Sequence, residues 1–96
     1  MAQEAIQFHN RLRKHRKMMG YTIRDVAWLL NLKSANRISQ WEQGKTKPSV
    51  DNLLRLGILY RSLTDQLYED YRSILRDELT LREQALAAKK KAHVEA

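Results

Sequence analysis

A short stretch of the chain combines polar side chains rich in hydrogen-bond donors and acceptors with two apolar residues that can anchor them. Ile38 and Trp41 are three positions apart, the spacing of one face of a helix. The other side then carries Ala35, Asn36, Arg37, Ser39, Gln40 and Gln43. Asparagine and glutamine match N6 and N7 of adenine, arginine matches guanine or phosphate, and an alanine methyl can contact a thymine methyl. The pattern indicates a helix that enters the major groove.

Capping residues divide the chain into the elements that must position this helix. The five predicted helices cover about residues 3–19, 22–30, 34–43, a stretch from 49 onward, and a stretch from 64 to beyond 86. Serine or threonine begins each of the last four, where its oxygen can accept from a first-turn amide. Gly20 and Gly44 end the first and third, and Asn31 can take the left-handed conformation that ends the second. Two short helices joined by a tight turn form a helix-turn-helix.

The composition favours an all-α fold and a polyanionic partner. Three glycines and one proline are few, whereas residues that favour helices are abundant. The net charge of +7 is uneven, because residues 1–63 carry +8, residues 64–86 carry −3 and residues 87–96 carry +2. A basic head with an acidic helical extension suits a DNA-binding unit joined to an element with another role. A solvated charged surface is the alternative.

Several function classes are disfavoured by what the chain lacks. There is no cysteine, and the three histidines do not share the spacing of a helical metal pair, so we expect neither a metal site nor a cofactor. No nucleophile and base set or glycine-rich phosphate loop can be argued, which makes an enzyme the least favoured class. No apolar run approaches the ~20 residues that span a bilayer, so no membrane partner is expected and a reducing cytoplasm suits the chain.

Two consecutive runs of the chain resemble a known family of DNA-binding regulators. The run TIRDVAWLLNLKSANRISQWEQGKTKPS is similar to the helix-turn-helix of Cro/CI/Xre-type phage repressors and their bacterial relatives, and LRKHRKMMGY before it is similar to that family's first helix. Most specific is the Ile-Ser-x-Trp-Glu-x-Gly-Lys-x-x-Pro spacing from Ile38 to Pro48. The resemblance covers about residues 8–67 and implies a five-helix lambda-repressor-like domain, here with a long C-terminal helix, in a bacterial or phage cytoplasm.

The resemblance assigns DNA contacts to matching positions. The predicted base-edge residues are Asn36, Arg37, Gln40, Ala35 and Ser39. The predicted phosphate contacts are Arg24, Lys33, Ser34, Gln43, Lys45 and Lys47. Phosphate contacts set the register of the protein on DNA, whereas base contacts carry specificity. The resemblance also implies an ion pair between Arg16 and Glu42 that fixes the first helix against the third.

Two positions depart from the family pattern. The family usually has a glutamine after the capping residue of the second helix, where it clamps a phosphate. Ile23 stands there in this chain, and Arg24 is the candidate replacement. The turn between Asn31 and Ile38 is one residue longer than the commonest family spacing. The sequence leaves open whether the third helix starts earlier or enters the groove in a shifted register.

The fifth predicted helix carries an apolar stripe wider than packing against one neighbour requires. A second subunit is the preferred occupant, because small helix-turn-helix dimers read two half-sites about one DNA turn apart. The predicted dimerisation residues are Leu67, Tyr71, Ile74, Leu75 and Leu79. The alternative is that this helix folds back on its own core. We therefore divide the chain into a head over 1–63, a dimerisation helix over 64–88 and a basic disordered tail over 89–96.

The sequence thus predicts a sequence-specific DNA-binding regulator, a homodimeric repressor on a pseudo-palindromic operator. The first alternative is an antitoxin-type autoregulator whose C-terminal helix binds a toxin. The second is a helical adaptor that has lost DNA binding. Double-stranded DNA is the expected partner in all but the last.

Overall fold

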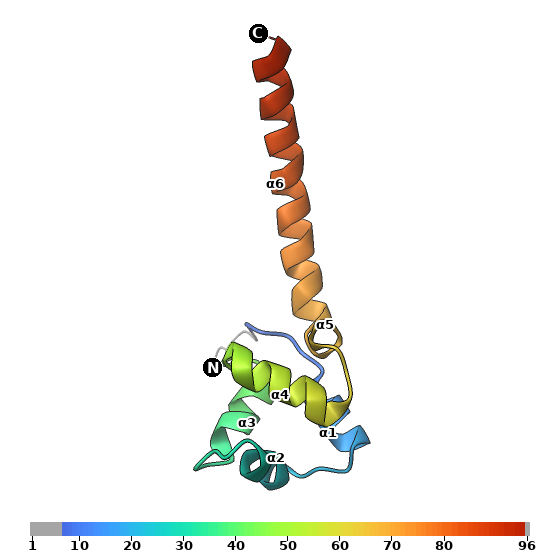
Figure 1. The fold of residues 1–96 in the computed structure, drawn as a ribbon. Helices are drawn as coiled ribbons and strands as arrows, with labels where there is room; N and C mark the ends of the chain where they lie inside the picture. The colour runs from blue at the N-terminus through green and yellow to red at the C-terminus, as the bar shows by residue number, and fades with distance from the viewer. Residues whose placement is uncertain (1–6, 96) are drawn as a thin grey trace, which may run out of the picture.

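Six helices and the segments that join them form residues 7–95, the part of the chain that this computed structural model describes. The helices are α1 (Leu12–Met18), α2 (Ile23–Leu29), α3 (Asn36–Glu42), α4 (Val50–Tyr60), α5 (Thr64–Leu67) and α6 (Glu69–Glu95). The first five pack into a head, from which α6 projects (Figure 1). No strand occurs among the described residues, so the all-α fold is confirmed, with one helix more than predicted.

One apolar core holds the head together. All five of its helices contribute, and the most deeply buried members are Leu12, Val26, Ile38, Trp41, Leu56, Tyr60 and Leu67. Short helices of seven residues, such as α1, α2 and α3, are marginal in water by themselves. Their stability therefore comes from the face that each one buries in this shared core.

The helix α1 begins at Leu12, and the prediction of a helix from about Gln3 is wrong over residues 7–11. These residues form an irregular segment, the N-terminal strap, whose Gln7 and Phe8 amides donate to the carbonyl of Gly44 at 3.2 and 3.0 Å. Asn10 donates to the carbonyl of Trp41 at 2.8 Å and accepts from the amide of Leu12 at 3.0 Å. These bonds to the end of α3 replace those of a helix. Residues 3–6 lie outside the described part.

A break at Tyr68 divides the predicted fifth helix into α5 and α6. Tyr68 has φ −118° and ψ 33°, outside the helical region. The Leu67 carbonyl accepts a 2.8 Å hydrogen bond from the amide of Arg11, just before α1. That bond occupies the acceptor that a continuous helix would offer to the amide of Tyr71. Neither glycine nor proline lies at this position, so no residue type in the sequence indicates the helix break.

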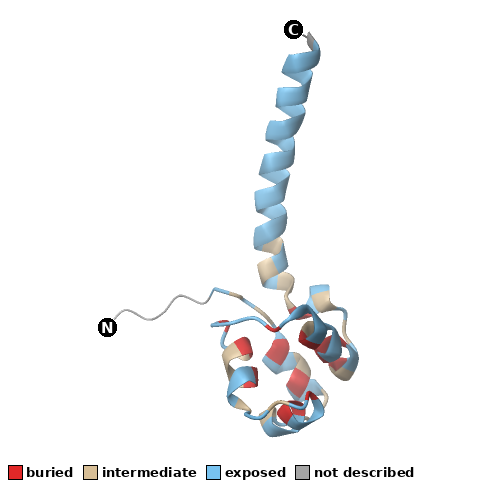
Figure 2. Ribbon diagram, turned by 60° about the vertical axis from the view of Figure 1, so that its left-hand side comes forward, coloured by how far each residue is buried: buried red, intermediate tan, exposed pale blue. Residues whose placement is uncertain are grey.

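The helix α6 leaves the head after its first turns. Every residue from Ile74 to Val94 is exposed, as the pale blue length of α6 in Figure 2 shows. Its 27 residues contribute to a longest molecular dimension of 61 Å. Residues 89–95 continue this helix, so the prediction of a disordered tail is wrong for the residues that the structure describes. No helix between residues 7 and 95 is long and apolar enough to cross a membrane.

Leu67 lies in the core of the head and not on the projecting helix. It is fully buried as the last residue of α5, so its assignment to a dimerisation surface is wrong. The other four predicted dimerisation residues lie on α6, where Tyr71 is half-buried and Ile74, Leu75 and Leu79 are exposed. The alternative in which this helix folds back on the core is not observed beyond Ser73.

Candidate nucleic-acid interface

The start of α2 is fixed by a capping box. Thr22 Oγ1 accepts from the Asp25 amide at 3.0 Å, and the Asp25 carboxylate accepts from the Thr22 amide at 2.9 Å, as the predicted cap requires. Ile23 is half-buried and packs against the core, whereas Arg24 is exposed. The position at which the family places a phosphate-clamping glutamine is thus a packing position here. Arg24 is the basic side chain that faces water at this end of α2.

The turn between α2 and α3 reverses the chain without glycine. Asn31 has φ 57°, the predicted left-handed conformation, and the Leu32 amide donates to the Ala27 carbonyl at 2.8 Å. Ser34 Oγ accepts from the Asn36 amide at 3.0 Å, and Ala35 already has helical φ and ψ. Ser34 therefore acts as the cap of α3, and the helix does not start earlier than predicted.

The helix α3 has one face in the core and one face in water. Ile38 and Trp41 are 1% and 2% exposed, which confirms them as anchors. The predicted base-edge residues divide into two groups. Asn36 and Arg37 are exposed, whereas Ser39 and Gln40 are half-buried and Ala35 is half-buried against the core. The side chains most exposed for reaching into a groove are therefore Asn36 and Arg37, with Ser39 and Gln40 at the edge of this face.

Two side chains of this face make contacts within the head. The Arg37 guanidinium lies 5.9 Å from the centroid of the Trp41 ring. Gln43 donates from Nε2 to Ser39 Oγ at 2.9 Å. Exposed contacts of these kinds contribute about 1 kcal/mol or less each. A base or a phosphate can therefore replace them at small cost.

A buried ion pair orients α3 against α1. Arg16 Nε lies 2.6 Å from Glu42 Oε2, a second bond of 3.1 Å makes the contact bidentate, and both side chains are less than a tenth exposed. Arg16 also donates to the Tyr21 carbonyl, just before α2, at 2.8 Å. The hydrogen bond to Glu42 raises the pKa of Arg16, so the guanidinium stays charged. The pair implied by the resemblance is present, and it ties α1, α2 and α3 together.

The basic loop after α3 carries its two lysines differently. Gly44 ends the helix with φ 73° and is buried under the N-terminal strap. Lys45 is exposed to water, whereas the Lys47 ammonium lies 5.4 Å from the centroid of the Phe8 ring. Lys45 is therefore free to reach a phosphate, and Lys47 must first leave the ring. Lys33 and Ser34 are exposed at the other end of α3.

The N-terminal strap is the part of the site that the sequence analysis missed. Asn10 links it to the last turn of α3 through the Trp41 carbonyl, so the strap braces α3. The sequence contained a signal for the start of α1, because asparagine is among the preferred capping residues. In the structure Asn10 Oδ1 accepts a hydrogen bond from the amide of Leu12. The apolar periodicity of Ile6 and Phe8 with Leu12 masked this signal.

These residues offer hydrogen-bonding groups and positive charge. Within residues 7–95 no group of three or more His, Cys, Asp or Glu side chains could hold a metal ion. A short polar helix held rigidly beside exposed basic side chains is the arrangement of a DNA-reading helix-turn-helix.

Comparison with protein families places the chain in this class. The helix-turn-helix family model HTH_3 matches residues 12–62, which is more than half of the chain. The chain therefore belongs to the Cro/CI/Xre-type helix-turn-helix family of DNA-binding transcription regulators. No curated protein matches the chain as a relative.

Proposed function

We propose that this regulator is a repressor that binds a pseudo-palindromic operator as a homodimer, in the cytoplasm of a bacterium or phage host. The observation that carries the proposal is the rigid mounting of α3, whose Arg16–Glu42 pair and buried Ile38 and Trp41 hold its polar face outward. A helix so held loses little further entropy on entering a groove. Occupation of a promoter is sufficient for repression, since it requires binding alone.

Specificity is assigned to the exposed face of α3. Gln40 and Asn36 are proposed to bond adenine, and Arg37 to bond guanine after leaving Trp41. Ala35 and Ser39, which are less exposed, contribute apolar or hydroxyl contacts at the edge of this face. Each well-formed bidentate contact of this kind discriminates against the wrong base by about 1–3 kcal/mol.

Affinity is assigned to the basic and polar side chains around that face. The proposed phosphate contacts are Arg24, Lys33, Ser34, Gln43, Lys45 and Lys47. All six are exposed in the structure. Each neutralised phosphate releases counterions, so binding weakens as salt concentration rises.

The test is selection of bound sequences from random DNA, followed by affinity measurements on the selected operator. Gln40→Ala and Arg37→Ala should weaken operator binding by roughly 5- to 150-fold and leave binding to random DNA nearly unchanged. Gln84→Ala and Arg76→Ala are matched controls, because both residues are exposed on α6. Equal affinity of the wild-type protein for operator and random DNA would reject the proposal.

Lys45→Ala separates the two kinds of contact. It should weaken binding to operator and random DNA alike and lower the dependence of log affinity on log salt by about 1. A selective loss on the operator would instead assign Lys45 to a base.

A second candidate function rests on the exposed apolar residues of α6. In an antitoxin-type autoregulator this helix would bind a toxin, and the head would bind the promoter of the toxin and antitoxin genes. Stoichiometric co-purification of an unrelated protein that is released by substitutions on α6 supports this alternative over the simple repressor.

A further inference from the structure

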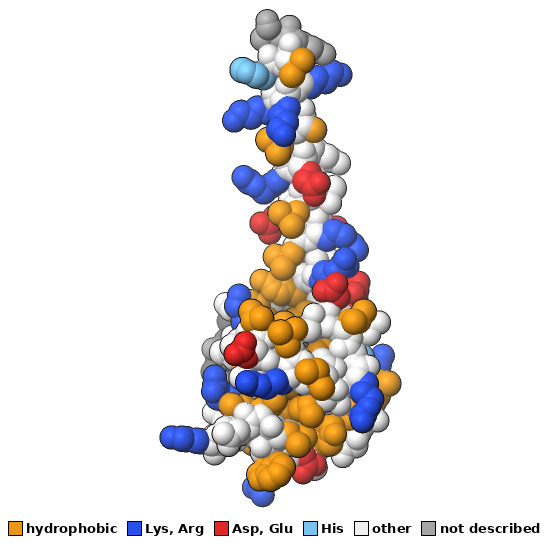
Figure 3. Space-filling model, in the orientation of Figure 1, with side chains coloured by type: hydrophobic (Ala, Val, Ile, Leu, Met, Phe, Trp, Pro, Cys, Tyr) orange, Lys and Arg blue, Asp and Glu red, His pale blue; other side chains and the backbone are white. Residues whose placement is uncertain are grey.

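One side of α6 carries a row of apolar side chains that begins at the head. At about 100° per residue, Tyr71, Leu75, Leu79 and Leu86 fall within a narrow stripe. We call these four residues the α6 stripe. Its three leucines are 43%, 57% and 51% exposed, a large fraction for side chains of this type. Figure 3 shows hydrophobic side chains following one another along the helix from the head outward. Water covers this face in the single chain.

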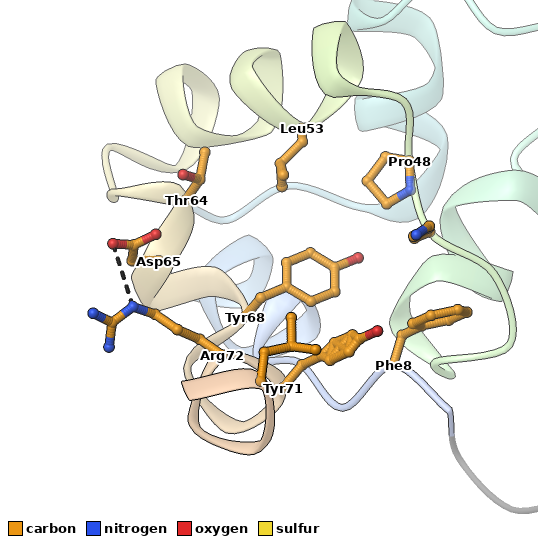
Figure 4. A pocket seen from close by; sticks show the side chains of 10 residues that line it. Phe8, Pro48, Leu53, Thr64, Asp65, Tyr68, Tyr71 and Arg72 are labelled. Carbon is orange, nitrogen blue, oxygen red and sulfur yellow. Dashed lines mark ion pairs between the residues drawn. The ribbon is translucent and has the colours of Figure 1, made fainter. Parts of the chain in front are cut away.

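The α6 stripe is continuous with a groove on the head. The groove has a volume of about 330 Å³, and its apolar lining is Phe8, Pro48, Leu53, Tyr68, Tyr71 and Leu75. In Figure 4 the Tyr68 ring lies below Leu53 and Pro48, and the Tyr71 ring lies below Tyr68 and beside Phe8. The Phe8 and Tyr71 rings are 5.4 Å apart between centroids. A helix laid along the stripe would therefore end against this groove.

The charges of α6 determine which occupant suits the stripe. Residues 69–81 carry four acidic and two basic side chains, and residues 82–95 carry four basic and two acidic ones. The first half is therefore net negative and the second half net positive. A second copy of α6 complements the first only when it runs in the opposite direction.

A parallel pair would bring like charges together. In a two-fold parallel pair each residue faces its own counterpart, and Arg82 and Lys89 lie on the same side as the α6 stripe. Arg82 would then face Arg82, and Lys89 would face Lys89. In an antiparallel pair that crosses near residue 80, Arg82 lies opposite the partner's Glu78, which is at the edge of the α6 stripe, and Lys89 lies opposite the partner's Tyr71. We propose that two copies of the chain pair through α6 in antiparallel orientation, with the end of each helix at the groove of its partner.

This proposal rests on the proposed DNA-binding function and sharpens the operator that it predicts. A helix of 27 residues is about 40 Å long. Antiparallel pairing places the two heads at opposite ends of the paired helices, so they are at least that far apart. One turn of DNA is about 34 Å, too short for this separation. The half-sites should therefore lie two turns apart, about 20–21 base pairs between centres, and not the single turn expected from the sequence.

Spin labels on the full chain test the orientation. The chain has no cysteine, so Ala92→Cys and Gln84→Cys each create a single labelling site. If the helices cross near residue 80, labels at 92 should be about 36 Å apart along the helix axis, and labels at 84 only about 12 Å apart along it. Short distances at both sites would indicate a parallel pair and overturn the proposal. The absence of a measurable distance at both sites would overturn pairing through α6.

Charged substitutions test the surface itself. Leu79→Glu combined with Leu86→Glu should raise the dimer dissociation constant at least 100-fold in sedimentation equilibrium, with the helical circular dichroism of the head retained. Leu81→Glu is the matched control, because Leu81 is 68% exposed on the same helix but about 120° away from Leu75. A dimer that survives the double variant would overturn the proposal. Dissociation by Leu54→Glu alone, on the exposed side of α4, would move the interface to the head and overturn it also.

Operator spacing separates this proposal from the function on which it rests. Wild-type protein should bind two half-sites two turns apart at least 10-fold more tightly than two half-sites one turn apart. A preference for the one-turn site, or for an isolated half-site, would reject antiparallel pairing and leave DNA binding intact. Loss of all preference for the selected sequence would reject the proposed function itself.

Discussion

The head and α6 obtain their helical structure from different sources. In the head, helices of seven residues are stable because each buries a face in one core. In α6, no residue from Ile74 to Val94 is buried, and the stretch is composed mainly of Ala, Leu, Arg, Lys and Glu, the residues with the strongest helix propensity. In the head, therefore, packing in the shared core stabilises the short helices. The projecting part of α6 is stabilised by the helix propensity of its own residues, and its apolar face remains exposed to water.

Two ion pairs show the same contrast. The Arg16–Glu42 pair lies inside the head with both side chains less than a tenth exposed. The Arg11–Asp70 pair joins the head to α6 at 3.2 Å, and about half of each side chain is exposed. Solvent weakens the attraction between Arg11 and Asp70. If Arg16 or Glu42 loses its partner, no water is present to solvate the charge that remains.

The largest expected effect comes from removing the buried arginine. Arg16→Met leaves the Glu42 carboxylate buried without its partner, so the free energy of unfolding should fall by about 3–5 kcal/mol. Urea denaturation measures the loss. Arg11→Met is the matched control, because its carboxylate partner Asp70 is exposed and returns to water, and its unfolding curve should stay close to wild type. Equal losses in the two variants would contradict the contrast between the pairs.

An intermediate effect is expected at alkaline pH from Tyr68, where α6 meets the head. Burial raises the pKa of Tyr68 to about 12, above the ordinary value of 10. Below pH 10 the phenol is neutral in both states and its contribution is complete. Between pH 10 and 12 the unfolded chain ionises first, so stability falls as pH rises, by about 1–2 kcal/mol after allowance for partial exposure of the ring.

Tyr68→Phe isolates this contribution. The Tyr68 hydroxyl is buried without a hydrogen-bond partner, so its removal should leave stability at pH 7 unchanged or slightly higher. The difference between variant and wild type should then grow from pH 9 to pH 11.5 in denaturation experiments. Parallel curves over that range would contradict the assignment. Burial also raises the pKa of Tyr60, so some alkaline loss remains in the variant.

The smallest effect is expected on the outer side of α6. Leu81→Ala removes a side chain that is 68% exposed and replaces it with the best helix former, so the free energy of unfolding should change by less than about 0.5 kcal/mol. Thermal unfolding at a fixed protein concentration measures it. A loss above 1 kcal/mol would show that this side of α6 is also covered, and would erase the distinction between the α6 stripe and the rest of the helix.

The site was predicted best where local chemistry is decisive. Thr22 with Asp25, Asn31, and Ser49, which accepts from the Asn52 amide at 3.2 Å, act as the sequence indicated, because each satisfies backbone groups only a few residues away. The anchors Ile38 and Trp41 followed from helical periodicity. The N-terminal strap and the break at Tyr68 did not follow, because each depends on a hydrogen bond to a residue more than thirty positions distant.

The sequence by itself determined that the chain is helical, that residues 36–43 have one apolar and one polar face, and that the charges of the head and of the extension differ in sign. Composition, capping and periodicity depend on residues close together in the chain, so they can be read from the sequence. Only the tertiary structure decided that Leu67 belongs to the core, that Lys47 lies over Phe8, and that α6 stands free of the head. Those outcomes depend on contacts between residues that are far apart in the sequence. Sequence spacing does not distinguish the possible contacts, and the packing of the folded chain selects one of them.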